Sequence, residues 1–374
     1  MWSSRCLTSE KSEEMKMQNE ILSTTYQLTS PGVIETKSIK RELLNDWVVI
    51  RPTLASVCHA DLRYYTGNRR PEALKKKLPM ALLHEGIGTV IQSNSSKFSV
   101  GERVVIVPNI PGEVLDPENF PNTKKLPVNY TKGNQFLGSG YDGIAQSHLV
   151  HPADCLVKIP DNIPDEIAVL AELCTVSYHA ISHIIHHLQD DSSKIALFGD
   201  GPVGYLTAAM ITSMYNIPKD RFTVFGADRE KLNNFYFTNQ EMVQEYDFES
   251  PKETFNIILE CTGGKFSESA INQAISLFEP CGHLVLMGVT EDRVPINTRD
   301  ILEKGLTLYG SSRSSTADFQ AVIDAMANEN YQKALRQILP NSFDVISNGN
   351  DFKIAMDQVV ANRAWKKTIL DFKF

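Results

Sequence analysis

The chain has 374 residues, which is enough for two or three domains. Hydrophobic residues make up 42% of it and charged residues 22%, so a disordered chain is excluded. The formal net charge of -8 argues against broad electrostatic capture of nucleic acid or of an anionic membrane surface. No apolar run approaches the roughly 18 residues of a membrane-spanning helix, and no apolar secretory segment opens the chain. We therefore expect a cytoplasmic protein.

The beginning of the chain and its cysteines carry little structural signal. Residues 1–20 are polar and without periodicity, so we expect a disordered extension, with Met15 or Met17 as alternative starts. The 6 cysteines are scattered and include no Cys-x-x-Cys pair. This usage indicates reduced thiols in place of a disulfide framework, and it lacks the spacing of a structural zinc lobe.

Residues 21–160 favour a strand-rich, barrel-like domain. The stretches 46–51 and 101–108 are β-branched runs bounded by turn residues, which is typical of strands. Residues 109–140 are rich in Pro, Asn and Gly and predict a long loop, a feature that is usually functional or lies at an interface.

The chain then changes to alternating helices and strands. Apolar residues recur at spacings of three and four over 164–188, which predicts a helix. Short apolar strands follow with helical segments between them, and this alternation indicates a parallel sheet with crossover helices. The strands are expected at 194–198, 221–225, 256–260 and 283–287, with later helices at 316–327 and 351–361 and a closing strand at 367–372 that returns to the first domain.

A glycine-rich turn joins the first of these strands to the next helix. The segment Gly199-Asp-Gly-Pro-Val-Gly204 matches the dinucleotide-binding fingerprint. In that motif the first glycine permits a tight turn, the second lets the backbone approach a pyrophosphate, and the third allows close packing of helix on sheet. An ordinary glycine turn is the alternative, but the flanking strand and helix favour the fingerprint. We predict cofactor contacts from Gly199, Gly201, Pro202, Val203 and Gly204.

The end of the following strand bears on the choice of cofactor. Enzymes that use NAD usually place an acid there for the ribose hydroxyls, whereas this strand ends in Gly226 and Ala227. Arg229 and Lys231 follow shortly and favour a 2′-phosphate, hence NADP(H). In the alternative interpretation these cations are solvated and Asp228 binds the ribose of NAD.

Several residues are candidates for metal binding, and each is weak in isolation. Cys58 alone suits a core thiol, and His84 alone suits a hydrogen-bonded loop histidine. A rival site is formed by histidines at i, i+4 and i+8 of one predicted helix, although a histidine-rich exposed face explains them better. These histidines are His179, His183 and His187.

Taken together, the motifs resemble the zinc-dependent medium-chain dehydrogenase/reductase family over nearly the whole chain after residue 20. The resemblance implies an α/β architecture: a GroES-like strand-rich catalytic domain at 21–175, a Rossmann doubly wound parallel sheet at 176–311, and a segment at 312–374 that returns to the catalytic domain. The segments that carry the resemblance are Cys58-x-x-Asp61, His84-Glu-Gly86, Gly101-Glu-Arg-Val, Ala171-Glu-Leu-Cys-Thr-Val-Ser-Tyr-His-Ala180, the glycine turn and Glu260-Cys-Thr-Gly-Gly264.

The same resemblance implies one catalytic zinc ion per chain, bound by Cys58, His84 and Glu172, with Glu85 as a fourth ligand or in exchange with water. It also implies that Thr262 contacts the cofactor. Periodicity alone gives Glu172 no support, because it lies off the apolar stripe and would be interpreted as solvated.

Asp61 and Ala60, both close to Cys58 in the sequence, bear on the histidine tautomer and on proton transfer. Asp61 is suited to accept a hydrogen bond from the His84 ring and fix its tautomer. Ala60 stands where many relatives carry a hydroxyl of a proton relay, so the proton has to travel by water, Glu85 or His59.

Longer segments narrow the resemblance to the ribulose-5-phosphate reductases of teichoic acid and capsule synthesis. They are Arg63-Tyr-Tyr-Thr-Gly67, Lys77-Leu-Pro-Met80, Gly263-Gly-Lys-Phe-Ser-Glu-Ser-Ala-Ile-Asn-Gln273 and Leu302-Glu-Lys-Gly-Leu-Thr-Leu-Tyr-Gly-Ser-Ser-Arg-Ser314. This likeness implies reduction of D-ribulose 5-phosphate by NADPH, a homodimer, and functional coupling to a cytidylyltransferase that forms CDP-ribitol.

A phosphorylated substrate requires cations in the pocket. Arg313, Arg69 and Arg70 are the candidates, because a guanidinium binds phosphate in a bidentate manner. Two other functions stay open at this point: an NAD-dependent dehydrogenase of a neutral polyol, and a non-catalytic member of the family that binds a nucleotide.

Overall fold

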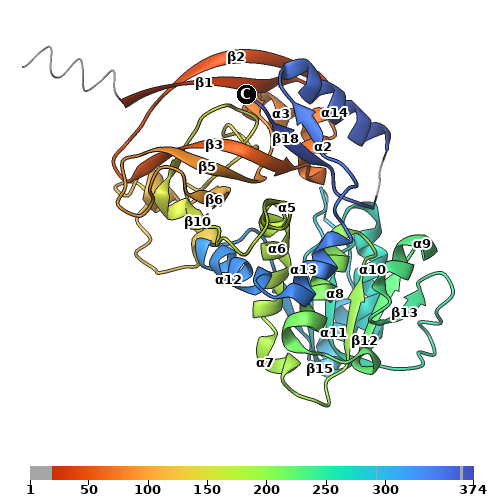
Figure 1. The fold of residues 1–374 in the computed structure, drawn as a ribbon. Helices are drawn as coiled ribbons and strands as arrows, with labels where there is room; N and C mark the ends of the chain where they lie inside the picture. The colour runs from red at the N-terminus through yellow and green to blue at the C-terminus, as the bar shows by residue number, and fades with distance from the viewer. Residues whose placement is uncertain (1–18, 292, 363–364) are drawn as a thin grey trace, which may run out of the picture. The chain divides into compact units, whose positions relative to one another are not determined.

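The computed structural model describes residues 19–291, 293–362 and 365–374 (Figure 1). The described residues form two compact units. The first comprises 19–169, 340–362 and 368–374, and the second comprises 170–291, 293–339 and 365–367. The extension expected at 1–20, including Met15 and Met17, lies outside the described residues except for its last two positions.

The first unit is built mainly of antiparallel strands, as its short β-branched runs predict. One sheet has the order β2-β1-β4, and a larger one has the order β10-β6-β5-β3-β18-β17 with β9 paired to β3. Its strands are β1 (Glu20–Ser30), β2 (Val33–Glu42), β3 (Trp47–Ser56), β4 (Met80–Ala81), β5 (Glu85–Ser93), β6 (Arg103–Ile106), β7 (Asn109–Ile110), β8 (Gln135–Phe136), β9 (Leu149–Pro152), β10 (Leu156–Lys158), β17 (Asp344–Ile346) and β18 (Ile369–Phe372).

The helices of the first unit are short, apart from the one near the carboxyl terminus. They are α2 (His59–Tyr65), α3 (Pro71–Lys77), α4 (Gly112–Leu115), α5 (Asp165–Ala168) and α14 (Gly349–Ala361), with 3₁₀ turns η1 (Val128–Tyr130) and η2 (Ala153–Cys155). The long loop predicted at 109–140 therefore contains β7, α4, η1 and β8, and β7 pairs with β8.

Two glycines allow β3 and β5 to lie against each other. The strands are antiparallel, with Ala55 opposite Gly86 and Pro52 opposite Gly88. A Cβ atom on Gly86 would lie 2.8 Å from the Leu54 carbonyl oxygen, and one on Gly88 would lie 2.5 Å from Cγ2 of Ile50. Glycine is required at both positions because the neighbouring atoms belong to the packed sheet.

The second unit is a parallel sheet with the strand order β13-β12-β11-β14-β15-β16, as the alternating pattern predicts. Its strands are β11 (Ile195–Phe198), β12 (Phe222–Gly226), β13 (Asn239–Met242), β14 (Phe255–Glu260), β15 (Phe278–Leu286) and β16 (Thr307–Gly310). Its helices are α6 (Ala171–Ser182), α7 (Ile185–Leu188), α8 (Pro202–Tyr215), α9 (Arg229–Leu232), α10 (Ser267–Ser276), α11 (Thr298–Lys304), α12 (Thr316–Met326) and α13 (Glu329–Arg336), with 3₁₀ turns η3 (Lys219–Arg221), η4 (Asn233–Phe235) and η5 (Gly264–Phe266).

The continuous helix predicted over 164–188 is instead three helices, α5, α6 and α7. The apolar spacing does not detect the break before α7, because tertiary packing buries Ile181, Ile184 and Leu188 on both sides of it. The prediction was therefore right about helical content and wrong about continuity.

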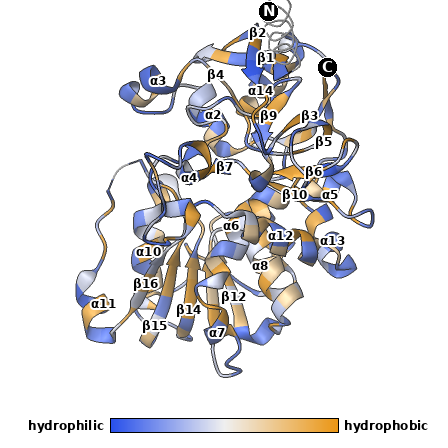
Figure 2. Ribbon diagram, turned by 90° about the vertical axis from the view of Figure 1, so that its left-hand side faces the viewer, coloured by the Kyte–Doolittle hydropathy of each residue, from blue (hydrophilic) through white to orange (hydrophobic). Residues whose placement is uncertain are grey.

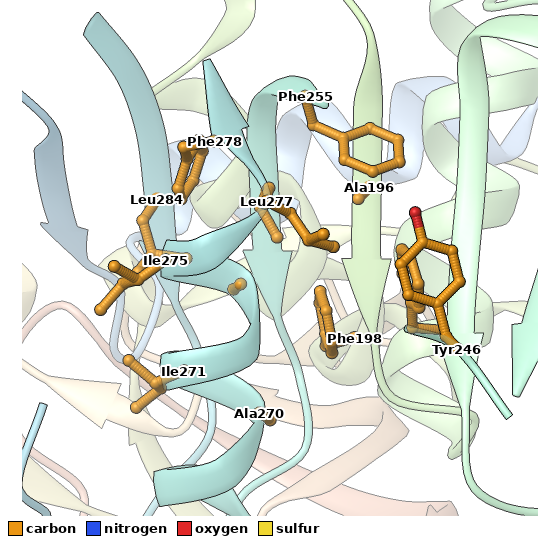
Figure 3. Packing of buried hydrophobic residues seen from close by; sticks show 13 residues of the cluster. Ala196, Phe198, Tyr246, Phe255, Ala270, Ile271, Ile275, Leu277, Phe278 and Leu284 are labelled. Carbon is orange, nitrogen blue, oxygen red and sulfur yellow. The ribbon is translucent and has the colours of Figure 1, made fainter. Parts of the chain in front are cut away.

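The core of the second unit explains its uninterrupted apolar strands. A parallel sheet covered on both faces buries the side chains of both, so β11 and β14 lack alternation (Figure 2). Figure 3 shows members of one core cluster, with Phe198 on β11 and with Ile271 and Ile275 on α10. This core fixes the carboxyl end of β11, from which the glycine turn begins.

Replacement of Gly88 by Ala tests the close approach of β3 and β5. We expect the free energy of unfolding to fall by about 1–3 kcal/mol, because the added methyl group collides with Ile50 and with the Arg51 backbone. Gly310→Ala is the matched control, since an added Cβ there meets nothing within 4 Å. Thermal unfolding of both variants provides the measurement, and equal midpoints would contradict the packing argument.

Candidate metal centre and dinucleotide-binding turn

Three metal-ligating side chains converge in the first unit. Cys58 follows β3 and caps α2, whereas His84 and Glu85 lie where β5 begins. The register of β3 on β5, with Ser56 opposite Glu85, brings these segments together. One ligand atom of each of Cys58, His84 and Glu85 lies within 4.8 Å of the others. In the part of the chain that the structure describes, this is the one group of three or more such residues.

The buried carboxylate of Asp61 connects the two ligand-bearing segments. Its Oδ2 accepts a hydrogen bond from the Cys58 N–H at 3.0 Å, and its Oδ1 accepts one from the Leu83 N–H at 3.0 Å. The Asp61 side chain has no exposed surface. His84 Nδ1 lies 3.6 Å from Oδ1, which is longer than a hydrogen bond. Asp61 thus holds the backbone on both sides of the centre, in addition to lying beside the imidazole.

The electrostatic surroundings of His84 favour a cation. Burial by itself lowers the pKa of this imidazole, but the charges of Asp61 and Cys58 outweigh burial and raise the pKa well above its usual range. A divalent ion bound by the same groups would take the place of that proton. Thiolate sulfur, imidazole nitrogen and carboxylate oxygen form a donor set that suits zinc, so these residues fit the metal implied by the sequence.

Ser56 and the backbone of Leu83 complete the centre, and no sequence motif predicted a role for either residue. The Ser56 hydroxyl donates to Oε2 of the fully buried Glu85 and orients that carboxylate. Leu83, directly before His84, has a φ of 75°, which is rare for a residue with a branched side chain. Gly143 packs against it so closely that an added Cβ would lie 2.2 Å from the Leu83 carbonyl oxygen. Tight packing therefore maintains the strained backbone that presents His84.

Glu172, the remaining predicted ligand, belongs to the second unit. It is the second residue of α6 and is buried, so the interpretation of its position as solvated is wrong. The periodicity missed its burial because α6 is covered on more than one face. The group formed by Cys58, His84 and Glu85 does not include it, and its role as a ligand stays a prediction.

The predicted dinucleotide turn has the geometry its glycines require. Gly199 follows β11 with a φ of 126°, and a Cβ on Gly204 would lie 2.0 Å from the Gly199 carbonyl oxygen. An added Cβ on Gly201 meets nothing within 4 Å, which leaves the backbone open to a phosphate group. Gly201 also caps α8, where Pro202 and Val203 begin the first turn and free N–H groups favour an anion. The turn therefore fits a dinucleotide.

Thr262 lies beside this turn, at the end of the adjacent strand. Its hydroxyl is 3.5 Å from the Phe198 carbonyl oxygen at the end of β11. The carboxyl ends of neighbouring parallel strands meet at one edge of the sheet, which is where α/β folds bind ligands.

The residues beyond β12 are arranged differently from an NAD site. Asp200 Oδ2 accepts hydrogen bonds from the N–H groups of Ala227 and Asp228, each at 2.7 Å. The Asp228 side chain caps α9 by accepting from the N–H groups of Glu230 and Lys231. Its Oδ1 is therefore already engaged by the backbone. Arg229 lies exposed beside Glu245, 2.7 Å away, and the Lys231 ammonium lies 3.8 Å from Asp228.

The rival histidines do not form a metal-binding group of three among the described residues. His187 lies on α7, separate from the α6 helix of His179. The expected exposed face is also wrong, because none of the three rings is free in solvent. His179 Nδ1 is 3.4 Å from an Asp318 oxygen, His183 stacks on Tyr309 and His187 stacks on His283.

The arginines proposed for a substrate phosphate lie in different units. Arg69 is half-buried in the first unit, with its guanidinium carbon 4.6 Å from the ring centroid of Tyr64. Arg70 is exposed at the start of α3. Arg313 is exposed in the second unit and has a φ of 62°.

Comparison with known proteins gives matches over nearly the whole length. Two family models match: Alcohol dehydrogenase GroES-like domain at residues 44–161 and Zinc-binding dehydrogenase at residues 225–328. Ribulose-5-phosphate reductase 1 of Staphylococcus aureus is 37% identical over 94% of this chain and 99% of that protein. Ribulose-5-phosphate reductase of Bacillus spizizenii is 35% identical over 94% of this chain and 100% of that protein.

A solved structure shows the same architecture. The crystal structure of S. aureus TarJ in complex with NADPH has a TM-score of 0.79 and 34% sequence identity, and the match covers 95% of this chain and 100% of that one. The expected combination of a GroES-like domain and a dinucleotide-binding parallel sheet is confirmed.

Asp61→Asn tests whether the buried carboxylate holds the metal centre. An amide has one acceptor oxygen, so its NH₂ group would face one of the two backbone N–H donors. We expect zinc affinity to fall about 10–100-fold. Glu260→Gln is a matched control, because Glu260 is equally buried and accepts backbone hydrogen bonds in the second unit. Zinc titration against a competing chelator measures both, and an equal loss in the two variants would refute a specific role for Asp61.

Proposed function

The chain belongs to the zinc-dependent medium-chain dehydrogenase/reductase family, and on this basis we propose that it reduces D-ribulose 5-phosphate to D-ribitol 5-phosphate with NADPH. The observation that carries the proposal is the 37% identity with a ribulose-5-phosphate reductase over 99% of that protein's length. The convergence of Cys58, His84 and Glu85 supports it, because one of the matching family models is Zinc-binding dehydrogenase and these residues form a donor set that suits zinc.

When bound, zinc supplies Lewis-acid polarisation of the C2 carbonyl group and NADPH supplies the hydride. Cys58 and His84 would hold the ion, with Glu85 as a fourth ligand or in exchange with water, and Asp61 keeps the backbone beside Cys58 and His84 in place. Glu172 is proposed as a further ligand. In the balanced reaction the C2 carbon would gain a hydride and the carbonyl oxygen one proton, with NADP⁺ as the oxidised product.

The proton source lies among a few groups near the centre. Water, Glu85 and His59 are chemically able to deliver it, since Ala60 offers no hydroxyl. Of these, Glu85 is buried and receives a hydrogen bond from Ser56, while His59 is exposed.

NADP(H) is proposed as the cofactor, held by the glycine turn, Thr262, Arg229 and Lys231. The capping role of Asp228 supports this choice, because an engaged carboxylate is a poor acceptor for ribose hydroxyls. The relative crystallised with NADPH gives independent support.

The product would be a precursor of CDP-ribitol for teichoic acid or capsule, and we propose that a cytidylyltransferase consumes it. A homodimer is proposed from the family likeness. The described cysteines are thiols that form no disulfide, which agrees with the reducing cytoplasm in which we place the enzyme. No helix among the described residues has the length and hydropathy needed to cross a membrane.

A small substrate panel tests the proposed reaction. The zinc-loaded protein is expected to oxidise NADPH with D-ribulose 5-phosphate, and to act at least about tenfold more slowly on D-xylulose 5-phosphate and on unphosphorylated D-ribulose. Absorbance of the nicotinamide is the measurement. Preference for unphosphorylated ketoses with NADH would favour a neutral polyol dehydrogenase, and inactivity of zinc-loaded protein on the whole panel would favour a non-catalytic role.

Cofactor choice is tested by Arg229→Ala combined with Lys231→Ala. Loss of two cations should raise KM for NADPH at least about tenfold and leave KM for NADH within about twofold, because only NADPH carries the 2′-phosphate. Arg299→Ala is the control, since Arg299 forms a similarly exposed ion pair with Glu303. Equal changes in KM for the two cofactors would defeat the assignment.

A further inference from the structure

A cluster of cations surrounds one buried tyrosine in the first unit. The cluster consists of Tyr64, Lys77, Ser139, Arg69 and Arg63, and is called here the Tyr64 cluster. We propose that it binds the phosphate group of the substrate, with Lys77 and Arg69 as the main phosphate-binding cations. This inference rests on the proposed function. It names the residues that bind the phosphate end of the substrate, whereas the metal centre acts on the carbonyl end.

Hydrogen bonds hold the cluster in one arrangement. The Lys77 ammonium donates to the Tyr64 hydroxyl oxygen at 2.8 Å and to the Ser139 hydroxyl oxygen at 2.8 Å. The two hydroxyl oxygens are 3.1 Å apart. The guanidinium carbon of Arg69 lies 4.6 Å from the Tyr64 ring centroid, and the Lys77 nitrogen lies 5.5 Å from it. Both cations are thereby fixed against one aromatic ring.

The charge of Lys77 has no counter-ion among the described residues. Both of its hydrogen-bond partners are neutral hydroxyl groups, although the side chain is half-buried. Exposed lysines of this chain, such as Lys252 beside Glu241, do form ion pairs. A partly buried ammonium is costly to desolvate without an anion, so a site built in this way is suited to bind one.

The direction of the pKa shift of Tyr64 agrees with a positive potential in the cluster. Burial raises the pKa of the Tyr64 hydroxyl, but hydrogen bonds from Lys77 and Ser139 and the charges of Lys77 and Arg69 outweigh burial and lower it. The pKa of the Arg63 guanidinium is lowered by burial and by the neighbouring charge of Arg69. An anion at this position would relieve both effects.

Two short segments of the chain, α2 and residues 136–139, connect the Tyr64 cluster to the metal centre. Tyr64 and Arg63 belong to α2, the helix that Cys58 caps, and the charge of Cys58 acts to raise the pKa of the Arg63 guanidinium. On the other side, the Phe136 ring packs against the His84 ring with centroids 5.3 Å apart, and the Phe136 carbonyl accepts the Ser139 N–H. The metal centre and the Tyr64 cluster are therefore connected both by α2 and by residues 136–139.

The chemistry of the substrate matches this arrangement. In D-ribulose 5-phosphate only C3, C4, C5 and the ester oxygen separate the C2 carbonyl group from phosphorus. With the carbonyl at the metal centre, the dianionic phosphate has to lie near it and needs several donors. An ammonium that already donates to two hydroxyls, together with a guanidinium, provides those donors.

Lys77→Met tests the proposal, with Lys76→Met on the exposed part of the same helix as the matched control. We expect Lys77→Met to raise KM for D-ribulose 5-phosphate at least about tenfold and to leave kcat/KM for unphosphorylated D-ribulose within about twofold. Lys77→Arg should restore part of the loss. Inorganic phosphate should inhibit the wild type competitively and inhibit Lys77→Met at least about tenfold less.

The outcomes separate this inference from the proposed function. If the wild type fails to reduce D-ribulose 5-phosphate, the proposed function fails. If the wild type is active but Lys77→Met affects both substrates alike, the inference is overturned. Should Lys77→Met fail to fold, Arg69→Gln takes its place with the same expected selectivity. If only Arg313→Ala produces a loss confined to the phosphorylated substrate, the phosphate is bound elsewhere and the inference is wrong.

Discussion

The buried carboxylate of Asp61 is the interaction on which the metal centre depends. Its two oxygens accept the N–H groups of Cys58 and Leu83, residues of two separate segments. A carboxylate without exposed surface is tolerated because both oxygens are hydrogen-bonded, and the same bonds bring the thiol and the imidazole together. Its negative charge also raises the pKa of His84 and prepares the site for a cation. One side chain thus sets both the geometry and the charge of the centre.

Local sequence patterns were sufficient to predict the architecture and the dinucleotide turn. The Gly199–Gly204 turn was predictable because each glycine of the motif meets a local steric requirement. The parallel sheet was predictable because the alternation of strands and helices is visible in local apolar patterns. Ser56 and Leu83 could not be predicted, because their roles depend on contacts made only in the folded chain. The Ser56–Glu85 bond joins residues 29 apart. Breaks between α5, α6 and α7 were missed for a related reason, since tertiary packing overrides the helical period.

At the adenosine end of the predicted dinucleotide site, Asp200 leaves no room for an acidic side chain at Gly226. An acid at Gly226 would serve an NAD enzyme, but a Cβ there would lie 3.0 Å from both Cβ and Oδ2 of Asp200. Asp200 in turn accepts the N–H groups of Ala227 and Asp228, so the backbone after β12 is already fixed by a carboxylate. A second acid would meet both steric conflict and like-charge repulsion. The glycine at this position therefore has a structural cause within the turn itself.

The α2 helix determines the spacing between the two ends of the proposed substrate site. Cys58 caps the helix, and Tyr64 lies near its other end. At about 1.5 Å of rise per residue, six residues separate these positions by roughly 9 Å along the axis. Asp61 anchors the metal end of the helix, and Lys77 and Ser139 hold the tyrosine end. Under the proposed assignment, α2 fixes the distance between the metal centre and the phosphate-binding cations, because both of its ends are held by hydrogen bonds.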